Sequence, residues 1–112
     1  MSVEKVFDAL ASRPRRQILA YLSAAELSTS DLAQRFGMSP ATISRHLSIL
    51  ENAGLVTSSR QGQFVLYRLN SDNLVNTLTA FAFELCPVGR PLKRESKEAA
   101  EARAGRAAKQ AT

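Results

Sequence analysis

The sequence predicts a mainly α-helical fold with one small β-hairpin. Three observations predict it: a capped helix over residues 39–54, a shorter capped helix just before it over residues 28–36, and two strand-like runs after it, residues 55–59 and 64–69. Two further helices are expected before these elements and one after them. The resulting order, α-α-α-α-β-β-α, is typical of a winged helix-turn-helix.

The helix over residues 39–54 has a clear start and a clear end. Ser39 is a good N-cap, Pro40 follows at a position where its missing N–H costs nothing, and Gly54 ends the helix. Four residues at i, i+3, i+4 and i+7 share one face, which we expect to point at the core: Ile43, His46, Leu47 and Leu50.

The opposite face of this helix is small, hydroxylic and basic, with no acid before Glu51. Such a face can lie in the major groove of double-stranded DNA, where small side chains let the backbone approach the bases and an arginine can bind a guanine or a phosphate. The alternative is an ordinary solvated helix face. The residues expected to face DNA are Ser39, Ala41, Thr42, Ser44, Arg45 and Ser48.

The preceding helix begins with a capping box, in which Ser28 and Asp31 stand three residues apart. Gly37 ends it. The connection over residues 37–39 is short and begins with glycine, which suits two helices that cross steeply. This spacing favours a helix-turn-helix over an isolated surface helix.

The two strand-like runs predict a hairpin whose turn is residues 60–63. Both faces of the second strand are fairly apolar, so we expect the strands to pack on helices. The tip is polar, and Arg60 and Gln61 are predicted to reach a phosphate or the minor groove. A polar hairpin tip is also common without any such role.

The first and last helices carry more apolar surface than one small core can absorb, which predicts a homodimer. The alternative is that Phe81 and Phe83 cover the hairpin. The residues predicted at the dimer interface are Val3, Val6, Phe7 and Leu10 in the first helix and Leu74, Leu78, Phe81 and Leu85 in the last.

Length and charge predict a single domain over residues 1–89 and a basic, alanine-rich tail over residues 90–112. The tail has no apolar side chain larger than alanine after Leu92, so we expect it to be disordered or a marginal helix. It holds 7 basic and 3 acidic residues, whereas residues 1–89 hold 8 and 7. We expect the tail to add nonspecific DNA affinity, and Arg15 and Arg16, at a helix start, to contact phosphate or to pair with nearby acids.

Several of these blocks together resemble the ArsR/SmtB family of small bacterial repressors over residues 3–86. The matching blocks are RRQIL at 15–19, ELSTSDLA at 26–33, SPATISRHLSILENAGLV at 39–56, and RQG at 60–62 before Tyr67. The resemblance implies a winged-helix homodimer on a palindromic operator near its own promoter, with first and last helices paired. It also implies base-facing positions at Ala41, Thr42, Ser44 and Arg45.

The chain departs from the metal-sensing members of that family. Where the arsenic and lead sensors have a Cys-x-Cys pair, this sequence has Ser28 and Ser30, and residues 71–85 contain no histidine. We therefore expect no metal and no cofactor. We interpret His46 as a partly buried structural group, with a direct DNA contact as the alternative. The chain is similar to autorepressors of the sporulation-delay type, whose inducer is a membrane protein, so a protein inducer is expected.

Other functions remain as alternatives. Cys86 is the only cysteine, and a redox-sensing repressor would need it to bridge two subunits. A winged helix used only for protein contacts is a second alternative. An enzyme is not expected, since one histidine and one cysteine leave little for a catalytic site. No segment approaches the ~20 apolar residues needed to span a bilayer and no signal-peptide pattern is seen, so a cytoplasmic protein is expected.

Overall fold

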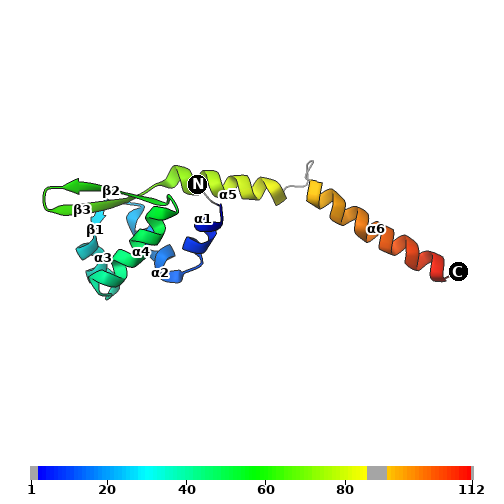
Figure 1. The fold of residues 1–112 in the computed structure, drawn as a ribbon, viewed down its shortest axis with the longest axis horizontal. Helices are drawn as coiled ribbons and strands as arrows, with labels where there is room; N and C mark the ends of the chain where they lie inside the picture. Colours follow the sequence, from blue (N-terminus) through cyan, green and yellow to red (C-terminus); the bar gives the residue numbers. More distant parts are fainter. Residues whose placement is uncertain (1–2, 86–90, 112) are drawn as a thin grey trace. The chain divides into compact units, whose positions relative to one another are not determined.

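The structure is a computed structural model that describes residues 3–85 and 91–111 (Figure 1). The chain divides into two compact units, Met1–Thr77 and Leu78–Thr112, which are described separately. The elements are α1 (Val3–Leu10), α2 (Arg13–Leu22), β1 (Leu27–Ser28), α3 (Thr29–Phe36), α4 (Pro40–Asn52), β2 (Val56–Gln61), β3 (Phe64–Leu69), α5 (Ser71–Leu85) and α6 (Pro91–Ala111). This order confirms the predicted winged helix-turn-helix and adds β1 and α6.

The core of the first unit is formed by the inner faces of α1 to α4 and the start of β2. Figure 1 shows these four helices gathered on one side of the β2–β3 hairpin. Burial of each large aliphatic side chain contributes about 1.5–3 kcal/mol to folding. The buried apolar residues are Val6, Ala9, Ile18, Leu19, Leu22, Leu32, Ile43, Leu47, Leu50, Ala53, Leu55 and Val56.

The helix-turn-helix is built from local hydrogen bonds that the sequence predicted. The Ser28 hydroxyl accepts from the Asp31 amide at 3.2 Å, and the Asp31 carboxylate accepts from the Ser28 amide at 2.9 Å, which completes the capping box of α3. At the other end Gly37 adopts a left-handed φ of 64°, and the Met38 amide donates to the Ala33 carbonyl at 3.2 Å. A side chain larger than hydrogen is strained at this φ, so glycine allows the abrupt turn into α4.

The hairpin is longer than expected and belongs to a three-stranded antiparallel sheet of order β1-β3-β2. β2 continues to Gln61, so the turn is the two residues 62–63 and not residues 60–63; Gly62 takes a left-handed φ of 61°. The tight turn is the reason that pairing extends to Gln61 opposite Phe64. The short strand β1 pairs with Tyr67 and Leu66 of β3, and two residues are too few to leave a periodic signal in the sequence.

Two asparagine side chains connect the start of α5 to the end of α4. The Asn70 side-chain amide donates to the Gly54 carbonyl at 3.0 Å, and the Asn73 side-chain amide donates to the same carbonyl at 2.9 Å. Leu74 also packs against the core. These hydrogen bonds therefore hold the first turn of α5 to the short segment between the end of α4 and the start of β2.

In the second unit, the segment expected to be disordered or a marginal helix is described as the helix α6. Every side chain of residues 94–109 is exposed, which agrees with a sequence that offers only alanine for burial. The division between the units falls inside α5. The predicted domain boundary after residue 89 lies outside the described residues and stays a prediction.

Candidate nucleic-acid interface

The outward face of α4 is set by the burial of its inward face. Ile43, Leu47 and Leu50 are each 0% exposed, so the opposite side of the helix must face solvent. His46 completes the inward stripe and is half-buried. All six residues expected to face DNA are exposed: Ser39, Ala41, Thr42, Ser44, Arg45 and Ser48. Their contact with DNA stays a prediction, but their position is the one that such contact requires.

Hydroxyl groups order the first turn of this face. The Ser39 hydroxyl accepts from the Thr42 amide at 3.2 Å and lies 2.9 Å from the Thr42 hydroxyl. Pro40 occupies the first helical position, as predicted. The first turn of α4 is thus ordered and exposed. The positive end of the helix dipole lies there, which suits a phosphate.

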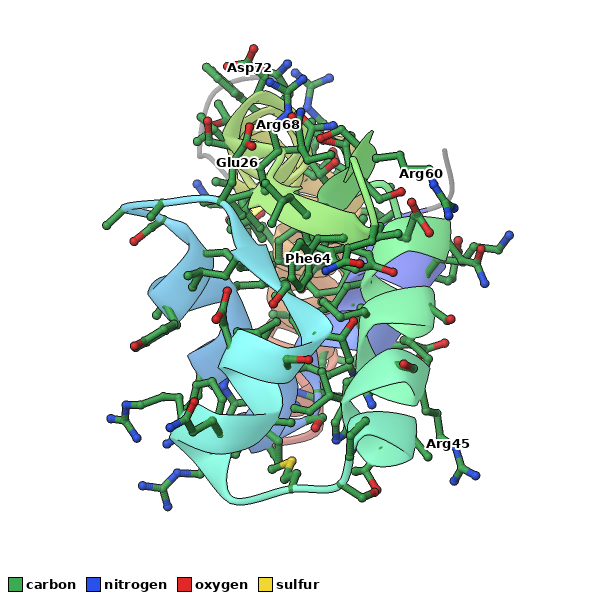
Figure 2. All side chains as sticks on the ribbon, turned by 90° about the vertical axis from the view of Figure 1, so that its left-hand side faces the viewer. Glu26, Arg45, Arg60, Phe64, Arg68 and Asp72 are labelled. Atoms are coloured by element: carbon green, nitrogen blue, oxygen red, sulfur yellow. The ribbon has the colours of Figure 1, made fainter. Side chains whose placement is uncertain are left out.

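Arg45 and Arg60 project from the same side of the first unit. In the view of Figure 2, Arg45 extends outward from α4 and Arg60 extends from the hairpin on the same side. Arg60 lies opposite Val65 in the β2–β3 register, on the strand face that includes Ser58 and Tyr67. The helix and wing cations that the sequence singled out therefore face the same way in this view, and Gln61 next to Arg60 is exposed.

The expectation that both faces of the hairpin pack on helices is wrong at its outer end. Tyr67 and Leu69 pack against the core, but Phe64 is 53% exposed and Val65 is 36% exposed. Because the hairpin extends beyond α1 to α4, none of these four helices covers its tip (Figure 1). The sequence pattern did not predict an exposed phenylalanine at the wing tip, because alternation alone does not show how far the hairpin projects.

Arg15 and Arg16 are engaged by the end of α1. The Arg15 guanidinium donates to the carbonyls of Ala9 at 2.8 Å and Asp8 at 2.9 Å, and Arg16 donates to the Leu10 carbonyl at 2.7 Å. They bind backbone carbonyls rather than the nearby carboxylates considered from sequence, because the last carbonyls of a helix lack internal partners. Their predicted contact with phosphate stays untested.

His46 has an unusual environment for a residue on a reading helix. Its Nδ1 atom is buried and has no hydrogen-bond partner in the part of the chain that the structure describes. Burial, together with the positive charges of Arg15 and then Arg45, lowers the pKa of His46 below its ordinary value of 6.5. His46 is therefore neutral at neutral pH and behaves as an inward-facing structural group.

We expect the lowered pKa of His46 to make folding pH-dependent. At a pH between the pKa of His46 in the folded protein and 6.5, the unfolded chain binds more protons than the folded one. The contribution of neutral His46 to the free energy of unfolding is therefore fully present above about pH 6.5 and is lost as the pH drops through this window. Thermal unfolding of the wild type and of His46→Gln at pH 7.5 and 5.5 checks this. The Tm of the variant should fall less; equal falls would contradict the assignment, since His46 is the only histidine.

The predicted dimer residues separate into exposed and buried groups. Val3 (47%), Phe7 (36%), Leu78 (39%) and Phe81 (40%) are exposed, as an interface within a homodimer requires. Val6 is a correction: it is 0% exposed because α1 turns it into the core of its own subunit. Leu10 and Leu74 are partly buried against that core, and the side chain of Leu85 lies outside the described residues.

The described residues, 3–85 and 91–111, contain no group of three or more histidine, cysteine, aspartate or glutamate side chains that could hold a metal ion. None of their helices is long and apolar enough to cross a membrane. Cys86 lies outside them, so the redox alternative stays a prediction.

A winged helix-turn-helix with an exposed basic and hydroxylic face on its second helix defines a class: the DNA-binding transcription regulators. Within this class the chain belongs to the arsR family. The family model described as "Bacterial regulatory protein, arsR family" matches residues 13–58. The transcriptional repressor SdpR of Bacillus subtilis is 36% identical over 76 residues, which cover 68% of this chain and 84% of SdpR.

Solved structures show the same fold. An ArsR-like transcriptional regulator from Rhodococcus sp. RHA1 is 31% identical with a TM-score of 0.74, covering 88% of this chain and 91% of its own. The homodimeric winged helix-turn-helix DNA-binding domain Mb0332 from Mycobacterium bovis is 33% identical with a TM-score of 0.63, covering 73% of this chain and 79% of its own. The family expected from the sequence is thereby confirmed.

Proposed function

We propose that this protein is a homodimeric repressor that binds a palindromic operator, with the region upstream of its own gene as the first candidate. One observation carries the proposal: α4 has a fully buried apolar stripe directly opposite an exposed face of small, hydroxylic and basic residues. The face fits a major groove, and its N-terminal residues would approach the base edges. Base-facing roles are proposed for Ala41, Thr42, Ser44 and Arg45, and backbone roles for Ser39, Ser48, Arg60 and Gln61.

The homodimer is proposed from the exposed apolar residues on α1 and α5. Val75 (57%) adds to Leu78 and Phe81 along the same side of α5. The relative Mb0332 is homodimeric, which supports the same arrangement here. Two subunits related by a two-fold axis would place two α4 helices about 34 Å apart, one turn of DNA.

The signal that releases DNA is proposed to be a protein partner. The serines at positions 28 and 30 offer hydroxyls where metal-sensing relatives have thiolates, and the Ser28 hydroxyl is committed to the α3 cap. SdpR, a repressor of similar sequence, supports the repressor role. We propose that the protein works in the cytoplasm, where it meets chromosomal DNA.

Arg45→Ala is expected to weaken operator binding by about 1–3 kcal/mol, because a bidentate contact to a base edge would be lost. Fluorescence anisotropy on the upstream duplex and on a shuffled duplex measures this loss. The matched control is Arg35→Ala, which removes the same charge from α3, where the guanidinium lies over Tyr21 at 5.6 Å and Phe36 at 5.3 Å. Equal losses on both duplexes would limit Arg45 to a phosphate contact, and no loss would contradict the proposal.

A further inference from the structure

The two halves of α6 differ sharply in charge. Residues 91–101 contain three cations, Lys93, Arg94 and Lys97, with three glutamates, whereas residues 102–111 contain three cations and no acid. In the first half Arg94 and Lys97 stand four residues before Glu98 and Glu101, a spacing at which opposite charges on a helix meet. The positive charge of α6 is therefore concentrated in its second half.

The three cations of the second half share one side of the helix. Arg103, Arg106 and Lys109 recur every third residue, so each is rotated by about 60° from the last and all lie within about 120°. They extend over roughly 9 Å of helix axis. All three are exposed. We call this row the cationic stripe; the opposite side of the same turns carries Ala104, Ala108 and Ala111.

We propose that the cationic stripe is a second, sequence-independent DNA contact, in which Arg103 and Arg106 bind phosphates beside the operator read by α4. The inference rests on the proposed function. Residues 1–89 hold 8 cations against 7 acids, so the reading domain itself offers little net attraction to a polyanion. The cationic stripe supplies that attraction without touching a base.

Two other roles for the cationic stripe, a membrane contact and stabilisation of the helix, agree less well with its residues. A helix that lies in a membrane surface buries Trp, Phe or Leu on its apolar side, and this stripe is backed only by alanine. Cations near a helix C-terminus also stabilise the helix itself, which would explain Lys109 in the last turn. That role does not extend to Arg103, which lies more than two turns from the end.

The test is the salt dependence of DNA binding by the full-length protein. The affinity falls as salt rises, so the plot of log K against log [salt] has a negative slope. Removing two phosphate contacts per tail makes this slope shallower by roughly 1.8, or by twice that when both tails of a dimer bind. We therefore expect the double variant Arg103→Gln with Arg106→Gln to have this shallower slope on the operator and on the shuffled duplex alike. The ratio of the two affinities should stay unchanged. The fourfold change from 50 to 200 mM salt should then alter affinity about tenfold less than in the wild type.

The matched control is Arg94→Gln with Lys97→Gln, which removes the same net charge from the half that also carries glutamates. Its slope should stay near that of the wild type; equal changes in both double variants would overturn the proposal in favour of net charge alone. Gly105→Ala tests helix content separately, because a Cβ there meets nothing within 4 Å and no charge changes. It should raise helicity by circular dichroism and leave the slope unaltered.

The remaining outcomes distinguish this inference from the proposed function. A wild-type slope in Arg103→Gln with Arg106→Gln, with operator preference intact, overturns the cationic stripe alone. Loss of binding to vesicles of anionic lipid, with an unchanged DNA slope, assigns the stripe to a membrane and also overturns it. Absence of operator preference in the wild type instead overturns the proposed function.

Discussion

Leu47→Ala is expected to lower the free energy of unfolding by about 2–5 kcal/mol. Leu47 is 0% exposed and lies between Ile43 and Leu50 on the inward stripe of α4. The substitution removes three buried carbons and leaves a cavity that a close-packed core fills only in part. Because small domains are stable by only about 5–15 kcal/mol, this single change removes much of the total. Urea unfolding at a fixed protein concentration measures it.

The matched control is the neighbouring residue in the chain. Ser48 is exposed on the outward face, so Ser48→Ala should alter the free energy of unfolding by no more than about 0.5 kcal/mol. Its effect should appear in DNA binding instead. Similar losses of stability in the two variants would show that α4 is not oriented as described.

Leu78→Glu is expected to convert the dimer to a monomer and to reduce operator affinity by about 100-fold or more. Leu78 is 39% exposed in the single chain, so a carboxylate there is tolerated by the free subunit but would be buried without a partner in a dimer. A monomer binds one half-site at a time and loses the effective concentration that joins the two binding events. Light scattering at micromolar concentration and anisotropy on the operator measure the two losses.

Asn76→Glu provides the matched control for this prediction. Asn76 is exposed on the same helix but faces about 160° away from Leu78. The same charge there should leave the dimer and its DNA affinity close to those of the wild type. A wild-type protein that is already monomeric at micromolar concentration would contradict the proposed interface directly.

The helix-turn-helix was predictable because its signals are local. Ser28 with Asp31, Ser39 with Pro40, and Gly37 each act through bonds or dihedral angles within a few residues, and the structure has all three as expected. The existence of α5 was predictable for a similar reason, since its apolar residues recur with the helical period. Periodicity also gave the outward face of α4, because burial of Ile43, Leu47 and Leu50 leaves only one orientation.

What the sequence did not reveal depends on contacts between distant segments. The strand β1 is two residues long and exists only because β3 lies beside it. The exposure of Phe64 depends on how far the hairpin projects beyond the helices. Val6 and Phe7 are adjacent in an apolar stripe, and only packing of α1 shows that the first is in the core and the second on the surface.

The arginines of α2 show a further limit. A cluster of cations at a helix start is typical of phosphate binding, but the structure places Arg15 and Arg16 on the carbonyls that end α1. The loop between α1 and α2 is short enough to bring these groups together, and sequence spacing does not disclose which acceptor is nearer. A charge pattern therefore predicts attraction, whereas the partner is fixed by the fold.

The central claim is that the outward side of α4 reads double-stranded DNA. Selection of duplexes from a random pool by the purified full-length protein tests it most directly. We expect a two-fold symmetric consensus with half-sites about one helical turn apart. For Arg45→Ala we expect a consensus that loses preference at the base pair which Arg45 contacts. Recovery of duplexes without any shared sequence, or an identical consensus from Arg45→Ala and the wild type, would contradict it.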